Sequence, residues 1–402
     1  MDFFEIMLQQ KLAGGGGDVK VDNLSITENG TYTALPGHAF SPVNVSVPTG
    51  VFPSGTSSIT ANGIYDITNF ASIDVNVSGG DGNSITADDI AMRTISGAIS
   101  GSATSICSNA FYYFSNLTTA SFPNATSIGD NAFCYCSRLT TVSFPNVTSI
   151  GSGAFSDCTS LTTVNFPSVT SIGINAFDNC TRLTTASFPN ATSINNSVFH
   201  YCTNLTTVNF PNATSIGGAA FYNCSRLTTV SFPNVTSIGS NAFTSCSSLT
   251  TVNLPNVTSI GDNAFYNCEK LTIASFSKVI LIGNYAFGYC TSLTTVNFPN
   301  VTSIGNSTFN NCTRLTTVNF PNATSIGSNA FSNCTRLTTA IFLASSVVTL
   351  NKANAFANTP MSNSTYTGSF GSIYVPASLV DSYKTATNWS YYADRITSYE
   401  GE

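Results

Sequence analysis

The side chains with the greatest chemical potential in this sequence are its cysteines, which recur at a fixed spacing. The chain has 402 residues and 12 cysteines. Ten of the cysteines follow one another at intervals of 22 residues: Cys136, Cys158, Cys180, Cys202, Cys224, Cys246, Cys268, Cys290, Cys312 and Cys334. Thiols in one column could form disulfides, bind zinc or pack as small apolar groups. Zinc requires four converging ligands, and parallel side chains in register give poor disulfide geometry. We therefore expect a buried column of reduced thiols.

Residues that could carry catalysis are few. The two histidines, His38 and His200, have no carboxylate or nucleophile at a motif spacing, and we expect both at the surface. The sequence contains no phosphate-binding loop, serine-hydrolase motif or zinc-protease motif. A polysaccharide-cleaving enzyme would need a pair of carboxylates in a groove, and residues 115–342 hold only five acids. The sequence therefore predicts a protein with no catalytic residues, no cofactor and no metal.

A repeated unit must position the thiols, because leucine follows the same interval. The leucines that share it are Leu117, Leu139, Leu161, Leu183, Leu205, Leu227, Leu249, Leu271, Leu293, Leu315 and Leu337. A fixed period of this length indicates one short supersecondary unit stacked many times. In one unit, Leu139, Val142 and Phe144 alternate as a strand with its apolar side inward. Val147 and Ile150 face inward from a second extended piece. We predict a mainly β solenoid of eleven 22-residue coils with terminal caps, preceded by small β modules.

Two slots of the unit carry further expectations. Gly151 turns the chain after the second extended piece, and we expect it at positive φ. In one coil Asn195 takes this slot, and asparagine is the residue that best tolerates that conformation in place of glycine. Cys107 occupies the glycine slot of an early coil. Cys134 lies among variable residues beside the cysteine column, where we expect an exposed thiol.

Composition divides the chain into several parts. In order they are a short amphipathic helix and glycine linker at 1–17, two small duplicated β modules at 18–80, a linker and amino-terminal cap at 81–110, the array at 106–342, and a carboxyl-terminal cap with a short helix at 343–402. Apolar residues at helical spacing place the first helix at 2–12, and Asn-Gly pairs mark hairpins in the duplicated modules. Near the end, Ser378 to Asp381 has the pattern of a capping box.

Charge and hydropathy limit the partners. Charged residues make up 8% of the chain, and the formal net charge is -6. The array has five acids and seven bases without a basic face, so we expect no nucleic-acid binding. No stretch of about 18 apolar residues occurs, so we expect no membrane span. Residues 1–8 lack the basic start of a secretory signal, and we expect any release from the cell to follow another route.

Recognition should fall on the slots that vary between units. The two residues between the repeated phenylalanine and cysteine change freely and are rich in tyrosine, which gives contact area at low entropic cost. Arginines recur two residues after the cysteine. The candidate ligand-binding residues are Tyr135, His200, Tyr201, Tyr222, Tyr266, Tyr289, Arg138, Arg182 and Arg226. The alternative interpretation is drift at a tolerant loop.

Two other surfaces offer weaker candidates. Outward Thr141 and Ser143 begin columns of hydroxyls that could bond sugars, although such residues also suit any exposed strand. One coil places Ile273, Ile280 and Leu281 where the others have polar residues. Exposed apolar side chains can mark a contact, and relaxed selection is the alternative.

The unit resembles the BspA-like class of bacterial leucine-rich repeats, through its Cys-x-x-Leu-x-x-Val-x-Phe-Pro and Ile-Gly-x-x-Ala-Phe signatures. The segments Ile373-Tyr-Val-Pro376 and Ala386-Thr-Asn-Trp389 are similar to the tail that follows such arrays. This resemblance implies a leucine-rich-repeat fold and a surface-exposed, non-enzymatic adhesion protein. The segments Ile26-Thr-Glu-Asn-Gly-Thr-Tyr32 and Pro42-Val-Asn-Val45 are similar to modules in tail-associated proteins of phages of gut Firmicutes.

These observations and resemblances lead to one functional expectation. We expect a phage tail-associated recognition protein that binds a glycan or protein on a bacterial or host surface. Residues 2–12 would attach it to other virion proteins. It would be extracellular or part of a virion, and cytoplasmic before assembly. The alternatives are a structural spacer, a bacterial cell-surface adhesin and a polysaccharide-cleaving enzyme.

Overall fold

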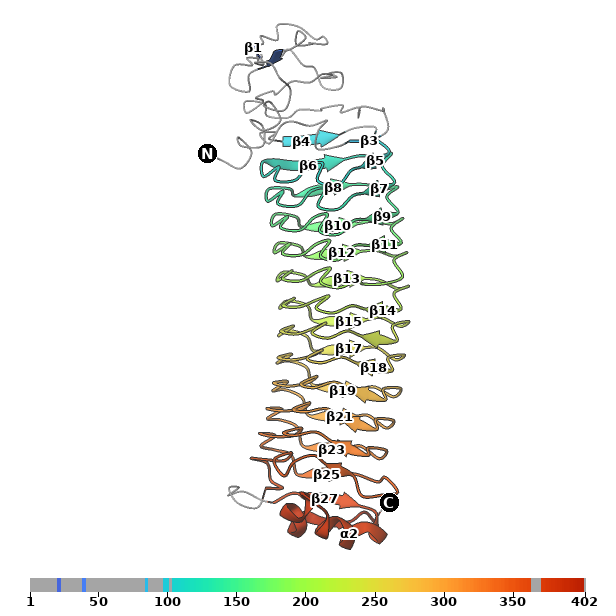
Figure 1. The fold of residues 1–402 in the computed structure, drawn as a ribbon, viewed down its shortest axis with the longest axis vertical. Helices are drawn as coiled ribbons and strands as arrows, with labels where there is room; N and C mark the ends of the chain where they lie inside the picture. The colour runs from blue at the N-terminus through green and yellow to red at the C-terminus, as the bar shows by residue number, and fades with distance from the viewer. Residues whose placement is uncertain are drawn as a thin grey trace.

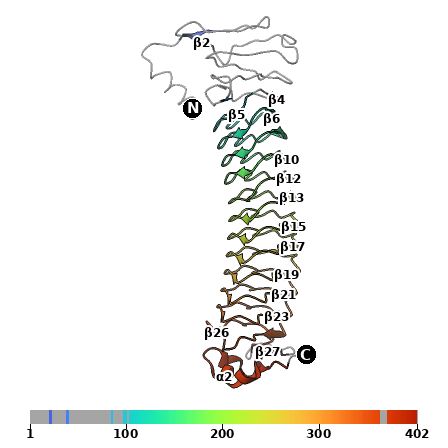
Figure 2. The ribbon, with the colours of Figure 1, turned by 90° about the vertical axis from the view of Figure 1, so that its right-hand side faces the viewer.

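The computed structural model describes residues 20–22, 38–40, 84–85, 97–100, 103–362 and 370–400. Strands β1 (Lys20–Asp22) and β2 (His38–Phe40) pair in parallel. The helix expected at 2–12 and the Asn-Gly turns of the duplicated modules lie outside the described residues. The other described elements form one stack of coils and its carboxyl-terminal end (Figures 1 and 2).

Each coil contributes strands to two parallel ladders. The long-strand face consists of β4 (Gly97–Ser100), β6 (Leu117–Ser121), β8 (Thr141–Ser143), β10 (Thr163–Asn165), β12 (Thr185–Ser187), β13 (Thr207–Asn209), β15 (Thr229–Ser231), β17 (Thr251–Asn253), β19 (Ile273–Ser275), β21 (Thr295–Asn297), β23 (Thr317–Asn319), β25 (Thr339–Ile341), β27 (Ser372–Val375) and β28 (Ile396–Ser398). The short-strand face consists of β3 (Ser84–Ile85), β5 (Ser105–Ile106), β7 (Ser127–Ile128), β9 (Ser149–Ile150), β11 (Ser171–Ile172), β14 (Ser215–Ile216), β16 (Ser237–Ile238), β18 (Ser259–Ile260), β20 (Leu281–Ile282), β22 (Ser303–Ile304), β24 (Ser325–Ile326) and β26 (Thr349–Leu350).

Neighbouring strands pair in parallel and in register, so equivalent side chains form columns. Thr163 lies opposite Thr185, which lies opposite Thr207. The solenoid prediction is confirmed, but the described residues form about 13 turns of 22-residue coils instead of eleven. The count from sequence was low because the coils at the two ends lack the lattice leucine. Strands β3 and β4 pair with β5 and β6, and β26 and β27 pair with β24 and β25.

The interior is one continuous apolar core built from columns. The predicted inward residues Leu139, Val147 and Ile150 are buried. Phe133 stacks on Phe155 with ring centroids 5.2 Å apart and planes 2° apart. A second phenylalanine column runs beside this one and touches it. A single coil could not bury these side chains alone, so the stacking of neighbours supplies the stability.

Short polar side chains join successive coils at the surface. The Oγ1 of Thr148 donates to the carbonyl of Thr126 at 3.1 Å, and the Nδ2 of Asn146 donates to the carbonyl of Pro123 at 2.7 Å. Equivalent bonds recur along the array, as between Thr170 and Thr148. These bonds satisfy turn carbonyls, which explains why the repeated Asn-x-Thr triplets serve the fold and why so few charges are needed.

The glycine slot after each short strand is required by close packing. Positive φ at Gly151 was the wrong expectation, because Gly153 is the glycine at positive φ in the described residues, with φ 62°. A Cβ on Gly151 would lie 2.5 Å from the backbone nitrogen of Asp130 and 2.5 Å from the carbonyl carbon of Gly129. Successive backbones therefore approach too closely at Gly151 for a side chain to fit without a shift of the backbone.

Asn195 shows what a side chain at this slot does. Its φ is not positive, so tolerance of that conformation does not explain it. The short-strand face divides here into a five-stranded sheet ending at β11 and a seven-stranded sheet beginning at β14. The Nδ2 of Asn195 donates to the carbonyl of Ile172 at 2.7 Å, whereas in other coils the glycine N–H makes this bond, as Gly173 does to Ile150.

The close-packing explanation predicts that one alanine will be tolerated and another will not. A Cβ on Gly239 would lie 2.5 Å from the backbone nitrogen of Gly218, so Gly239→Ala should destabilise the protein by about 1–3 kcal/mol. At Gly218 the nearest atom to a Cβ is 3.3 Å away, and Gly218→Ala should change stability by less than about 0.5 kcal/mol. Denaturant unfolding of both variants measures this, and equal losses would contradict the explanation.

The carboxyl-terminal end is covered by short helical turns. These are η1 (Ala377–Leu379), α2 (Val380–Thr385) and η2 (Trp389–Arg395). The N-cap of α2 is Leu379, without a side-chain cap bond, because Ser378 lies inside the preceding 3-10 turn. The expected capping box is therefore not formed.

The buried residues of this carboxyl-terminal segment form hydrogen bonds and ring contacts with the last coil. The Nε1 of Trp389 donates to the carbonyl of Val348 at 2.6 Å, and the N–H of Val348 donates to the hydroxyl of Tyr383 at 3.0 Å. The Trp389 ring lies 6.0 Å from Phe342 and 6.2 Å from Phe356. The segment closes the core and satisfies polar groups at the edge that stacking leaves open.

Candidate functional site

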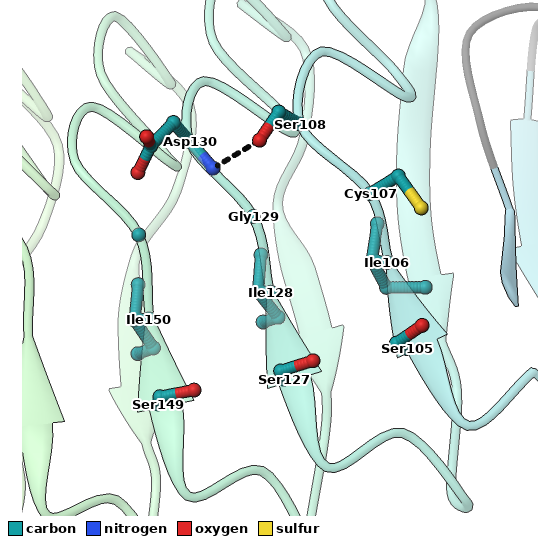
Figure 3. Close-up of a pocket in the computed structure, with 11 residues that line it drawn as sticks. Ser105, Ile106, Cys107, Ser108, Ser127, Ile128, Gly129, Asp130, Ser149 and Ile150 are labelled. Atoms are coloured by element: carbon teal, nitrogen blue, oxygen red, sulfur yellow. Dashed lines mark hydrogen bonds between the residues drawn. The ribbon is translucent and has the colours of Figure 1, made fainter.

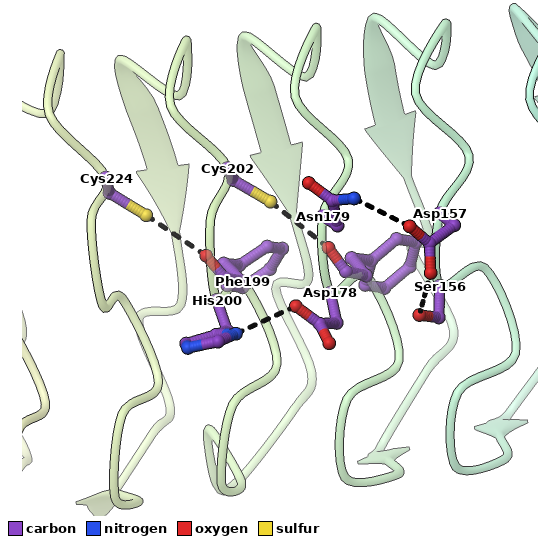
Figure 4. A network of polar contacts seen from close by, with 9 residues as sticks. Ser156, Asp157, Asp178, Asn179, Phe199, His200, Cys202 and Cys224 are labelled. Atoms are coloured by element: carbon purple, nitrogen blue, oxygen red, sulfur yellow. Dashed lines mark hydrogen bonds and ion pairs between the residues drawn. The ribbon is translucent and has the colours of Figure 1, made fainter.

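The cysteine column is buried, as predicted. All 12 cysteines are free thiols, and the ten column members have no exposed surface. The Sγ of Cys202 donates to the carbonyl of Phe177 at 3.1 Å, and Cys224 repeats this bond to Phe199 at 3.2 Å (Figure 4). Burial raises the pKa of the Cys290 thiol to about 12. The column is therefore a packing device with low thiol reactivity.

The two cysteines outside the column differ from each other. The expected exposure of Cys134 is wrong, because its side chain is only 6% exposed. Burial, with a further contribution from the charge of Asp157, raises the pKa of Cys134 to about 11. Cys107 is half-buried and lies at the rim of a shallow depression of about 560 Å³ beside β5, β7 and β9 (Figure 3). Asp130 is the one carboxylate lining this depression, so it lacks the pair that glycoside cleavage needs.

A third side of the rod, here named the turn edge, is formed by the turns that lead from each short strand to the next cysteine. Each turn has a residue at positive φ just before the cysteine slot, here named the left-handed slot. Its occupants are Tyr113, Tyr135, Asp157, Asn179, Tyr201, Asn223, Ser245, Asn267, Tyr289, Asn311 and Asn333. Bonds between coils hold the backbone there, as where the N–H of Tyr201 donates to the carbonyl of Tyr222 at 2.8 Å.

Tyrosine is an unfavourable residue for this slot. Asparagine and aspartate adopt the left-handed conformation several-fold more readily than other non-glycine residues, and they fill most of the slots. Tyr113, Tyr135, Tyr201 and Tyr289 have φ between 56° and 65°. Each costs on the order of 1 kcal/mol of backbone strain. These side chains are 38–45% exposed. Burial in the core therefore does not supply a free energy that would offset the backbone strain.

The exposed tyrosines gather in three aromatic clusters. In the first cluster, Tyr113 stacks on Tyr135 at 4.4 Å between centroids, and Tyr112 lies 4.7 Å from Tyr113. In the third cluster, Tyr266 lies 5.3 Å from Tyr289. Tyr285 completes it, 6.4 Å from Tyr266, at the other positive-φ position of its turn.

The second cluster joins a histidine to two tyrosines. The His200 ring lies 4.5 Å from Tyr201 and 5.1 Å from Tyr222. Its Nδ1 lies 2.9 Å from the Oδ1 of Asp178 (Figure 4). His200 is therefore half-buried and oriented by a carboxylate in the neighbouring coil, which differs from the plain surface residue that we expected.

Asp157 lies between the first and second clusters. It accepts a hydrogen bond from the Nδ2 of Asn179 at 2.6 Å and another from the Oγ of Ser156 at 3.2 Å (Figure 4). Its negative charge is the largest cause of the raised pKa of Tyr135. The carboxylates of Asp157 and Asp178 are thus held by polar partners in the same or a neighbouring coil.

All six aromatic residues among the predicted ligand-binding residues lie in these clusters. The clusters also contain three aromatic residues that were not predicted from the sequence. Tyr112, Tyr113 and Tyr285 were missed, although Tyr113 precedes Tyr135 by one 22-residue interval. The predicted arginines, Arg138, Arg182 and Arg226, are exposed beyond the cysteine slot.

The other predicted surfaces are also exposed. Thr141 and Ser143 face outward from the long-strand face. Ile273, Ile280 and Leu281 are 58%, 49% and 55% exposed, on two sides of one coil. Within the described ranges, no three histidine, cysteine, aspartate or glutamate side chains are placed to share a metal ion. The helices of the same ranges are all too short or too polar to cross a bilayer.

The sequence matches the family described as the BspA type leucine rich repeat region, with six copies over residues 104–227, 214–338 and 258–377. These ranges together cover more than half of the 402 residues. The chain belongs to this family. The predicted resemblance of the array is thereby confirmed. BspA-type arrays are scaffolds whose side-chain columns form binding surfaces, and this one places its strained aromatic residues on the turn edge.

Solved structures of bacterial leucine-rich-repeat proteins are similar to the chain. A leucine-rich cell surface protein from Faecalibacterium prausnitzii is 25% identical, with 72% of this chain and 86% of that chain covered and a TM-score of 0.43. A leucine-rich-repeat protein from Bacteroides ovatus is 22% identical, with coverages of 74% and 88% and a TM-score of 0.49. Among curated proteins, no sequence matches the chain.

Proposed function

We propose that this BspA-type protein is a non-enzymatic recognition protein that binds a surface ligand through the turn edge. The observation that carries the proposal is tyrosine at the left-handed slots, where Tyr135, Tyr201 and Tyr289 take the place of asparagine. Strained backbone positions cluster at functional sites, and exposed tyrosines are efficient contact residues. Drift at a tolerant loop would favour the unstrained residue.

The test replaces one tyrosine in each cluster by the residue that the array itself prefers. The combined variant Tyr135→Asn, Tyr201→Asn and Tyr289→Asn relieves about 1 kcal/mol of strain per site, which offsets the removal of exposed ring stacking. We expect its thermal midpoint to be at least that of the parent. We expect its binding to cells to fall at least tenfold, measured by flow cytometry on a panel of Gram-positive gut bacteria and cultured epithelial cells.

A matched control changes the same number of exposed residues on the long-strand face. Thr207→Ala, Thr229→Ala and Thr251→Ala alter three outward hydroxyls of β13, β15 and β17, and this variant should bind as the parent does. If the tyrosine variant retains full binding, the turn edge is not the recognition surface. If the parent binds no cell of the panel, the spacer alternative is supported.

We further propose that the protein works on a phage tail. The support is the resemblance of Ile26 to Tyr32 and of Pro42 to Val45 to tail-associated modules. Both segments lie outside the described residues, as do residues 2–12, which would attach the protein to its virion. Immunogold labelling of virions from a lysate tests this setting. Label on bacterial envelopes and none on tails would favour a cell-surface adhesin.

A further inference from the structure

The three aromatic clusters lie along the direction in which the coils stack. Tyr135 and Tyr201 occupy left-handed slots three coils apart, and Tyr201 and Tyr289 are four coils apart. With about 4.8 Å per coil, these intervals are roughly 14 Å and 19 Å. A ligand that touches all three clusters must therefore be extended and must follow the axis of the rod.

The surface between the clusters is polar. Asp157 takes one of the five intervening left-handed slots, and Asn179, Asn223, Ser245 and Asn267 take the other four. Their amides and hydroxyl both donate and accept hydrogen bonds, while tyrosine rings offer apolar faces. A folded protein partner would need one contiguous patch of roughly 800 Å², and small rings separated by amides do not provide it. Sugar hydroxyls and C–H faces fit this alternation.

The negative charges on the turn edge favour neutral polysaccharides over anionic ones. Asp157 and Asp178 lie between the first and second clusters, and Asp178 contacts His200 directly. The carboxylates would repel an anionic chain at this point. Cations are present at Arg138, Arg182 and Arg226, but beyond the cysteine slot.

We propose, resting on the recognition function above, that the turn edge binds a neutral linear polysaccharide whose chain spans the three aromatic clusters. Each cluster is a weak subsite, and the rigid array links the subsites at fixed distances. Such linkage raises the effective concentration at the second and third subsites and therefore the overall affinity. The number of coils between clusters then sets the register of the ligand.

The proposal predicts that affinity depends on coil number between the clusters. Duplicating residues 224–245 inserts one coil between the second and third clusters without adding or removing an exposed aromatic ring, because its two phenylalanines are buried. Duplicating residues 312–333 inserts a similar coil outside all three clusters. Neither segment contains a tyrosine, and each carries one arginine, Arg226 or Arg314. Repeat stacking tolerates such insertions, and circular dichroism of both variants checks that they fold.

The probes are immobilised amylose, a β-1,4-glucan, a mannan and a 1,4-linked galactan, with hyaluronan and teichoic acid as anionic comparators. We expect at least one neutral polymer to bind in preference to both polyanions. Duplication of 224–245 should weaken that binding at least tenfold, and duplication of 312–333 should leave it within twofold. Equal binding by the two duplications, no binding of any neutral polymer, or preference for a polyanion would overturn the proposal.

Treatment of cells separates this proposal from the function on which it rests. Cells that bind the parent should lose binding after periodate oxidation, which cleaves vicinal diols of sugars, and keep it after protease digestion. Loss after protease but not after periodate would overturn the polysaccharide and leave tyrosine-dependent recognition standing. Binding that the triple tyrosine variant retains would overturn the recognition edge itself.

Discussion

Between pH 9 and pH 11, we expect the array to lose most of its stability. Ten thiols have a pKa raised above the ordinary value of 9.0, with burial as the first cause: Cys134, Cys136, Cys158, Cys180, Cys202, Cys224, Cys246, Cys268, Cys290 and Cys312. Well below pH 9 both states keep these protons, and the full stability is present. Above pH 9 the unfolded chain releases them and the native state does not.

The size of the effect follows from linkage. At pH 10 each such thiol favours the unfolded state by roughly 1.4 kcal/mol, so ten contribute roughly 14 kcal/mol. This is comparable with the whole stability of many domains. Denaturant unfolding under a phosphine reductant, followed by circular dichroism from pH 7 to pH 11, measures it.

The control removes part of the column. The combined variant Cys202→Ala, Cys224→Ala and Cys246→Ala loses three of the ten thiols and creates small cavities that lower stability at every pH. Its stability should fall less steeply above pH 9, by about a third, because the slope counts titrating groups. A parent whose stability is unchanged at pH 11, or a variant with the parent's slope, would contradict burial of the column.

Truncating Trp389 should produce the largest loss from a single substitution. Trp389 is fully buried against Phe342, Phe356 and Tyr383, with ring centroids 6.0, 6.2 and 5.1 Å away. We expect Trp389→Ala to cost about 3–5 kcal/mol, because it opens a cavity and leaves the carbonyl of Val348 without its donor. The thermal midpoint and hydrogen exchange of residues 339–356 measure the effect.

Two further variants separate the contribution of the indole N–H from that of ring packing. Trp389→Phe keeps a ring but removes the N–H, and it should cost about 1–3 kcal/mol, the penalty of an unsatisfied buried carbonyl. Ser390→Ala changes an exposed neighbour in η2 and should cost less than about 0.5 kcal/mol. If Trp389→Ala is as stable as Ser390→Ala, the segment does not close the core.

The repeat predicts the interior well because one constraint is copied in every coil. A residue such as Leu139 or Phe144 has an equivalent 22 residues away, and both must occupy the same column once strands pair in register. An atypical residue in one coil therefore does not change the prediction that the column faces the interior. The end coils are harder to predict, because β3 and β27 contribute strands without repeating the leucine spacing.

The turn edge could be predicted only in part, because spacing does not reveal backbone conformation. Residues two before and one before the cysteine are both variable in sequence. In the structure the first packs toward the next coil, as Cys134 does, and the second lies at positive φ and points outward, as Tyr135 does. Likewise, nothing in the pattern separates a glycine needed for positive φ from one needed for close approach, which is the role of Gly151.

The central claim is that ligands meet the rod at its turn edge, and tyrosine footprinting on bound cells tests it most directly. Hydroxyl radicals oxidise exposed rings, and Tyr391 and Tyr399 at the carboxyl-terminal end are 44% and 40% exposed, close to Tyr135, Tyr201 and Tyr289. We predict that binding protects the three cluster tyrosines at least fivefold and leaves Tyr391 and Tyr399 unchanged. Equal oxidation of the cluster tyrosines in free and bound protein would contradict the claim.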